Sequence, residues 1–310
     1  MSAYQLKQNG QKFLIAVFRF GLLIGLSYII LYTIILKLSV SFMSAEDLID
    51  FSVKWVPKYW TLENYRIAAD MMGFWKNLLI TLSISTAGML IQTFFCTLAG
   101  YGFARFDFKG KSLIFLFVIL TLIIPPQTYM VASYTQLLYF DIFGIGSLFG
   151  MRPVNLINTP LPLFLLSLGC VATKNGLYIY VMRQFFAKLP KEIEEAAEVD
   201  GAGVFRIFFN VMLPNARPAI ITVLVLSFIW IYNDLYMATT YMPEVQMFST
   251  VLSTLPYVFK SAISGPGAAT VEVSVISNAG AILTLIPIIL IFCIVQRMFV
   301  EGVERTGITG

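Results

Sequence analysis

Few residues in this sequence could carry out acid–base, nucleophilic or metal chemistry. The 310-residue chain has no histidine, which excludes imidazole metal ligands and histidine-based catalysis. Its cysteines, Cys96, Cys170 and Cys293, stand singly in apolar runs and predict no disulfide framework. Residues 110–112 resemble the end of a phosphate-binding P-loop, but Arg105 stands where that motif requires a glycine. We therefore predict a chain that is not an enzyme and has no metal or cofactor site.

The polar insert between residues 188 and 217 has a spacing that predicts a docking element. Pro190 suits the first turn of a helix, and glutamates that follow it favour the positive end of the helix dipole. Ala196 and Ala197 keep one side of this helix narrow, so that another surface can approach closely. The glutamates are Glu192, Glu194 and Glu195.

A second short helix is predicted over residues 203–212. Asp200 and Gly201 are expected to supply a turn and a cap ahead of it, and Pro214 is expected to end it. By itself, the pattern also fits an amphipathic helix pair that lies on a membrane surface without a partner.

The elements that hold this insert must be suited to lipid. Hydrophobic residues make up 58% of the chain and charged residues only 12%, whereas soluble domains carry roughly 25% charged residues. A water-facing surface cannot be covered with so few charges, so most of the outer surface must face lipid. The composition predicts an all-α integral membrane protein, because a span in lipid must satisfy its backbone hydrogen bonds internally.

Six apolar runs are long enough to cross a hydrocarbon core of about 30 Å. The predicted spans are 13–37, 77–104, 112–138, 156–186, 217–241 and 275–299. With both termini in the cytoplasm, most lysines and arginines outside the spans fall on the cytoplasmic side, which supports that orientation. The long loop 38–76 and the loop 242–274 are then outside, and the insert 188–217 is inside. The whole chain, 1–310, is expected to be a single transmembrane domain.

The spacing within the insert resembles the EAA loop of ABC importer permeases, EAA-x3-G-x9-I-x-LP. The matching residues are Glu195, Ala196, Ala197, Gly201, Leu213 and Pro214, with Val211 in the isoleucine position. Further stretches are similar to carbohydrate-uptake permeases such as the smaller membrane subunit of the maltose importer: 77–79, 100–111, 183–186, 233–234 and 296–302. The resemblance covers roughly residues 65–305. One departure is Tyr232, where many relatives have tryptophan.

This resemblance implies the type I importer permease fold in a bacterial cell membrane. The chain would be one of two paired permease subunits, its partner being a different chain, and would import mono- or oligosaccharides. Its other partners would be two ATPase subunits, which bind ATP and Mg²⁺, and an extracellular solute-binding protein or lipoprotein. No nucleic acid is expected. The residues implied to couple transport to the ATPase are Glu195, Ala196, Ala197, Asp200, Gly201, Leu213 and Pro214.

Polar residues inside the predicted spans are candidates for the cargo path, because such residues are costly in lipid and usually face protein or water. They are Lys174, Asn175, Tyr232, Asn233 and Asp234. Helix–helix packing would explain them equally, and an ion pair between Lys174 and Asp234 fits either role.

Two outer segments are candidates for contacts outside the membrane. By analogy with the family, Ser264, Gly265, Pro266 and Gly267 could reach the binding protein, although a flexible connector has the same composition. Trp55, Trp60 and Trp75 are typical of anchors at the membrane interface, and docking of the binding protein is the alternative.

Two other functions are compatible with the sequence. The EAA loop indicates the motor and not the cargo, so a permease for a non-sugar solute is one alternative. A membrane enzyme or a carrier that works without an ATPase is the other, and activity of the isolated chain in vesicles would identify it.

Overall fold

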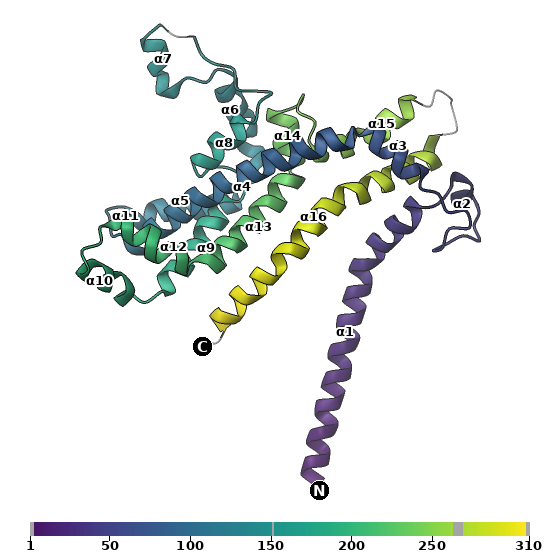
Figure 1. The fold of residues 1–310 in the computed structure, drawn as a ribbon, viewed down its shortest axis with the longest axis horizontal. Coiled ribbons are helices and arrows are strands. Elements are labelled where there is room, and N and C mark those ends of the chain that lie inside the picture. The colour runs from purple at the N-terminus through teal and green to yellow at the C-terminus, as the bar shows by residue number, and fades with distance from the viewer. Residues whose placement is uncertain (1–2, 151, 263–268, 308–310) are drawn as a thin grey trace. The chain divides into compact units, whose positions relative to one another are not determined.

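The computed structural model describes residues 3–150, 152–262 and 269–307, and nearly all of them are helical (Figure 1). Within these ranges there is no β-strand, only an isolated antiparallel bridge between Phe140 and Val154. The predicted all-α class is therefore confirmed. The four residues predicted to contact a binding protein, Ser264 to Gly267, lie outside the described residues.

The elements follow one another along the chain with short connections. They are α1 (Ala3–Ser41), α2 (Ala45–Ile49), α3 (Glu63–Met71), α4 (Phe74–Arg105), α5 (Lys111–Ile123), α6 (Pro126–Leu138), the 3₁₀-helix η1 (Ile142–Gly144), α7 (Ile145–Leu148), α8 (Leu161–Leu168), α9 (Asn175–Lys188), α10 (Glu192–Val199), α11 (Val204–Ile207), the π-helix η2 (Phe208–Met212), α12 (Leu213–Asn215), α13 (Arg217–Asn233), α14 (Leu235–Tyr241), α15 (Phe248–Ala262) and α16 (Ala269–Gly307).

The chain divides into two compact units. The first contains Met1–Gly73 and Thr254–Ile286, and the second contains Phe74–Ser253 and Pro287–Gly310. The polar insert and the predicted intramembrane polar residues all belong to the second unit.

Three described helical stretches are long and apolar enough to cross a membrane: Lys12–Ser41, Phe74–Arg105 and Val271–Gln296. Two bent pairs raise the number of candidate spans to five if each pair is one span. The first pair, α5 and α6, bends by 105° at Pro125, where proline removes a backbone donor. The second pair joins residues 204–215 to α13 with a bend of 77°.

The predicted fourth span, 156–186, is interrupted. Helix α8 ends at Leu168 and α9 begins at Asn175. Between them, Cys170 and Lys174 have φ angles of 58° and 69°, in the left-handed region that non-glycine residues rarely adopt. Hydropathy alone could not predict this break, because neither residue type favours that conformation.

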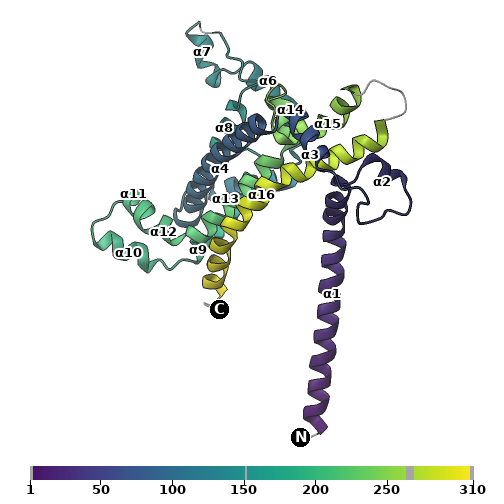
Figure 2. The same cartoon turned by 45° about the vertical axis from the view of Figure 1, so that its right-hand side comes forward.

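Helix α4 is the central helix of the second unit, and α9 and α13 pack beside it (Figures 1 and 2). The approach to α9 is closest at Gly100. A Cβ atom at this position would lie 2.5 Å from the Cβ of Met182 and 2.9 Å from the backbone nitrogen of Arg183. Only a residue without a side chain therefore permits this packing.

The α4–α9 contact can be tested by replacing Gly100 with valine. We expect Gly100→Val to destabilise the protein by about 1–3 kcal/mol, the usual cost of overpacking a tight contact. Thermal unfolding of the purified chain in detergent measures the change. Gly102→Val is the matched control, because a Cβ atom there would meet no atom within 4 Å. Equal unfolding temperatures for the two variants would contradict the packing described here.

Candidate functional site

The polar insert folds into two helical segments that begin and end for identifiable reasons. Helix α10 ends in a Schellman motif, in which the Gly201 amide donates to the Glu198 carbonyl (2.9 Å) and the Ala202 amide to the Ala197 carbonyl (3.0 Å). Gly201 has a φ of 79°, which glycine adopts without steric cost. Gly201 therefore makes the turn that the sequence predicted.

The second segment is longer than predicted and ends differently. It runs over residues 204–215, and its N-cap is Gly203 without a side-chain hydrogen bond, so the predicted cap by Asp200 is wrong. Pro214 lies within the helix instead of ending it. The π-helical turn just before it explains this, because the Leu213 amide bonds the Phe208 carbonyl before the residue that lacks an N–H.

A buried ion pair fixes the insert to α4. The Nε atom of Arg105 lies 3.1 Å from Oε2 of Glu194, and these side chains are only 6% and 14% exposed. Arg105 also donates from Nη2 to the Leu189 carbonyl at 2.8 Å, and the Tyr101 hydroxyl donates to Oε1 of Glu194 at 3.1 Å. Sequence reasoning placed all three glutamates on α10 but did not identify Arg105 or Tyr101 as their partners.

Apolar packing surrounds this ion pair. The Tyr101 ring packs against Phe186 and Phe208, with ring centroids 5.4 and 5.0 Å away. Met182 and Met212 are completely buried in the same cluster. The insert is thus a rigid extension of the helical core and not a flexible connector.

The opposite face of the insert is open. Glu195, Ala196, Asp200, Gly201 and Pro214 are exposed, whereas the remaining predicted coupling residues, Ala197 and Leu213, are half-buried against the core. Apolar side chains accompany them, with Val199 at 89% and Phe205 at 79% exposure. An exposed face that combines large apolar and acidic side chains is typical of a protein docking surface.

The P-loop-like tripeptide at 110–112 has a structural role. Gly110 adopts a φ of 85° ahead of α5, and Nζ of Lys111 lies 3.0 Å from Oδ1 of Asp107. The hydrogen bond from Lys111 lowers the pKa of Asp107, so this pair remains charged near neutral pH.

Asn175 belongs to a buried polar network. Its amide oxygen accepts a hydrogen bond from Gln92 of α4, and Gln92 also accepts one from the Ser227 hydroxyl of α13. The Gln92 amide donates to the Thr173 carbonyl at 3.0 Å. These bonds join three helices, so the arrangement around Asn175 explains it as a packing residue. Gln92 was missed in the sequence because one amide in an apolar helix carries no motif.

Lys174 and Asp234 have separate partners. The Nζ atom of Lys174 lies over the Trp230 ring, 4.4 Å from its centroid. The Asp234 carboxylate caps α14 by accepting from the Met237 amide at 2.9 Å. The ion pairs found among the described residues do not include one between these two. Tyr232 is buried, and Asn233 is exposed and donates to the Ile229 carbonyl at 2.9 Å.

Lys174 also lines a cavity of about 750 Å³ at the break between α5 and α6. Five further polar residues share the wall: Thr121, Tyr129, Ser133, Gln136 and Thr173. The cavity therefore offers a cation, hydroxyls and an amide in the part of the chain formed by broken helices. Such groups suit a hydroxyl-rich ligand.

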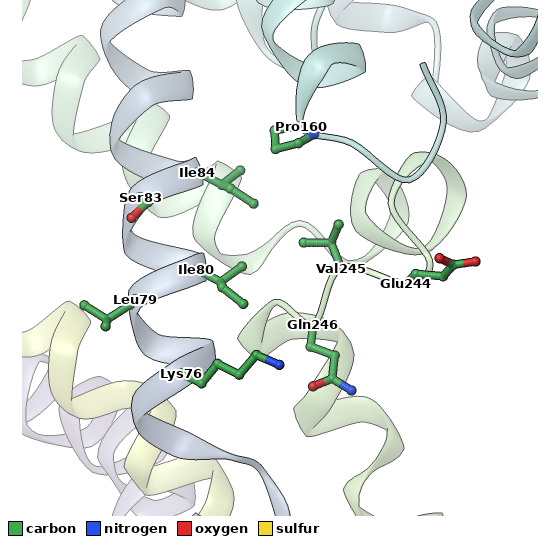
Figure 3. Close-up of a pocket in the computed structure, with 9 residues that line it drawn as sticks. All are labelled: Lys76, Leu79, Ile80, Ser83, Ile84, Pro160, Glu244, Val245 and Gln246. Carbon is green, nitrogen blue, oxygen red and sulfur yellow. The ribbon is translucent and has the colours of Figure 1, made fainter. Parts of the chain in front are cut away.

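A second cavity of about 650 Å³ lies beside the first turns of α4 (Figure 3). Lys76 and Gln246 extend along its wall, and Ile80, Ile84 and Val245 form an apolar part. Asn77, next to this wall, donates to Oε1 of Gln246 at 3.3 Å. The side chains that line this cavity fix the start of α4 to the segment before α15.

The long apolar helices, the rigid docking insert and the cavity at broken helices define an α-helical membrane protein of the transport class. The chain belongs to the family of binding-protein-dependent transport system inner membrane components, whose family model matches residues 96–305. This membership confirms the resemblance that the EAA spacing indicated.

Curated relatives agree with this family. The chain is 28% identical over 246 residues to the probable ABC transporter permease protein PH1036 of Pyrococcus horikoshii, covering 78% of this chain and 79% of the relative. It is 27% identical to the maltodextrin transport system permease protein MdxG of Bacillus subtilis, covering 92% and 93%. These relatives are named as permease proteins, a role distinct from that of an ATPase.

A solved structure has the same fold. It is a chain of a bacterial ABC transporter involved in the import of the acidic polysaccharide alginate, with a TM-score of 0.71 and 18% sequence identity. The match covers 93% of this chain and 98% of that one. The described helices therefore have the type I importer permease fold.

The buried ion pair predicts a specific sensitivity to mutation. Glu194→Ala should destabilise the insert by about 3 kcal/mol, because it leaves the Arg105 guanidinium buried without its partner. Trypsin should then cleave the purified chain faster at Lys191 and Arg206. Glu192→Ala is the control, since Glu192 is exposed on the same helix. Equal cleavage rates in both variants would show that the ion pair does not hold the insert.

Proposed function

We propose that this chain is one of two permease subunits in an ATP-driven bacterial importer of oligosaccharides. The family membership and the similarity to a maltodextrin permease protein support this assignment. The observation that carries it is the exposed acidic and apolar face of α10 and α11, fixed to α4 by the Arg105–Glu194 pair. A membrane protein without a cytoplasmic partner has no need for so rigid a docking surface.

In the proposed topology, the chain crosses the cell membrane six times and both termini are cytoplasmic. Helices α8 and α9 together would form the fourth crossing, broken at residues 169–174. Half-helices of this kind are tolerated in a membrane where the freed backbone is buried in protein or lines a cavity. The distribution of basic residues supports this orientation, which places the insert 188–217 in the cytoplasm.

The insert would dock on an ATPase subunit that holds ATP and Mg²⁺. The exposed residues Glu195, Ala196, Asp200, Gly201 and Pro214 would face the ATPase, whereas Ala197 and Leu213 would pack behind them. Closure of two ATPase subunits on ATP would then displace the insert. Because Glu194 ties α10 to the end of α4, the displacement would move the central helix of the second unit. ATP binding would thereby shift the population between two packings of the subunit.

The cargo path would run along the cavity that contains Lys174. The hydroxyls and amide on its wall match the hydrogen-bonding groups of a sugar, and the cation and aromatic ring at Lys174 and Trp230 add an orienting element. Asn175 and Tyr232 would shape this path from buried positions, and Asn233 and Asp234 would mark its continuation at the break after α13.

Outside the membrane, a solute-binding protein would deliver the cargo. The family is described as binding-protein-dependent, and this supports such a partner. The outer segment with Ser264, Gly265, Pro266 and Gly267 is the proposed contact. The second permease subunit would be a different chain.

The function is tested by purifying the chain with its natural partners in lipid vesicles and measuring ATP hydrolysis. Oligosaccharides should stimulate hydrolysis together with uptake. Stimulation only by a non-sugar solute would support the alternative cargo class and retain the permease role. Transport by this chain alone, without ATP hydrolysis, would contradict the proposal and indicate a carrier.

Coupling can be tested on the exposed face of α10. The double variant Glu195→Lys with Ala196→Trp should lower uptake and transport-linked ATP hydrolysis by about tenfold or more, because it places a wrong charge and excess volume in a close interface. Glu63→Lys, a charge reversal in α3, is the control. If uptake is unaffected while the protein inserts normally, the coupling role of α10 is wrong.

The role of Lys174 can be tested by replacing only its charge. Lys174→Met should change the uptake rate by about tenfold, which corresponds to about 1.4 kcal/mol and to one lost hydrogen bond with a charged group. Lys174→Arg should retain most of the rate. Lys260→Met, at an exposed site on α15, is the control. Unchanged kinetics in Lys174→Met would assign Lys174 to helix packing alone.

A further inference from the structure

In the first unit, the segment after α1 folds back along that helix. The Trp55 ring lies against Tyr32 with centroids 5.1 Å apart and an interplanar angle of 84°. The Ser39 hydroxyl donates to the Trp55 carbonyl. Tyr32 and Ser39 are about 10 Å apart along the helix axis at 1.5 Å per residue. The Trp55 side chain therefore extends from the level of Ser39 toward the middle of α1.

The depth of this contact follows from the length of α1. Its apolar stretch from Lys12 to Ser41 has 30 residues, about 45 Å, whereas the hydrocarbon core is about 30 Å thick. If the stretch is centred in the bilayer, Lys37 lies at the edge of the core and Tyr32 lies inside it. Side chains on a helix also point toward its N-terminus, which takes the Tyr32 ring deeper. The Trp55 ring therefore reaches the depth of the acyl chains.

The residues around Trp55 expose apolar side chains. Phe51 is 98% exposed, and Ile49, Val56 and Trp60 are also mostly exposed. The Trp60 ring packs one edge against Phe42, with centroids 5.5 Å apart. In water, a cluster of this kind would be unfavourable, whereas at the boundary between headgroups and acyl chains it is stabilising.

The same segment carries charges suited to the headgroup layer. Lys54 is exposed, and Nζ of Lys58 lies 3.6 Å from Oδ2 of Asp50. Hydrogen bonds from the Ser52 hydroxyl and amide lower the pKa of Asp50, which keeps this carboxylate ionised. Charged groups beside exposed aromatic residues are typical of segments that lie at a membrane interface.

Backbone and side-chain hydrogen bonds hold the segment in place. The Thr61 amide donates to the Phe42 carbonyl at 3.0 Å, and the Tyr59 amide donates to Oδ2 of Asp47 at 3.0 Å. Asp47 is itself buried. Because both ends of residues 49–60 are fixed to the unit that contains α1, their depth is set by the depth of α1.

We propose that residues 49–60 form a lipid-inserted finger, in which Phe51, Val56 and the Trp55 ring enter the acyl region of the leaflet at the C-terminal end of α1. Lys54 and Lys58 lie at the level of the lipid phosphates. The ligand of this surface is the lipid bilayer. The finger would anchor the end of α1 without contact to another protein.

The depth of Phe51 tests the proposal directly. The full chain, with the subunits that co-purify with it, is placed in nanodiscs of zwitterionic and anionic phospholipids. Cys96, Cys170 and Cys293 are first replaced by alanine, and a nitroxide label is attached at Phe51→Cys. Collision rates of the label with oxygen, which concentrates in lipid, and with a water-soluble nickel complex are measured. Labels at Ile24→Cys on exposed α1 and at Lys109→Cys in the exposed turn are the lipid and water controls.

The expected result is a ratio of oxygen to nickel collisions at Phe51 that is several-fold above that at Lys109 and close to that at Ile24. A Val56→Cys label gives an independent measurement if the Phe51 variant does not assemble. A ratio similar to that at Lys109 would overturn the proposal by placing the finger in water. Shielding from both reagents would also overturn it, since a protein partner would then cover the finger. Neither outcome depends on which solute the chain transports.

Discussion

The ion pair between Arg105 and Glu194 is the interaction on which the site depends. Two charges removed from water are tolerated only while they remain paired, and here the pairing requires that α10 stays against the end of α4. The Tyr101 hydroxyl and the Leu189 carbonyl occupy further hydrogen-bonding positions around the pair. The insert therefore moves with the central helix, and in the proposed importer this rigid connection transmits the motion of an ATPase to the membrane part.

Polar groups within the apolar helices are of two kinds. Gln92, Asn175 and Ser227 bond one another in a buried network, which lowers the cost of placing them in a medium without water. Lys174 instead lines a cavity beside broken helices and contacts the face of an aromatic ring. The first kind stabilises the packing of helices, and the second leaves polar groups available to a solute.

Outside these polar sites, the chain presents apolar side chains to its surroundings. Helix α1 is exposed along most of its apolar length, and its exposed residues are as hydrophobic as those in the core. Lipid is the surrounding that makes such a surface stable. The finger after α1 extends the same principle to a segment outside the long helices, where aromatic and basic residues alternate.

The sequence by itself determined the class of the protein, its family and the position of its docking insert. Composition and long apolar runs suffice for the class, and the spacing from Glu195 to Pro214 suffices for the family, because these patterns are local. Only the tertiary structure decided which glutamate turns inward, since neighbouring residues on a helix differ by about 100° and Arg105 is distant in the chain. The partner of Lys174 was decided in the same way: Trp230 comes from another helix, and no spacing along the chain encodes a contact that only folding creates.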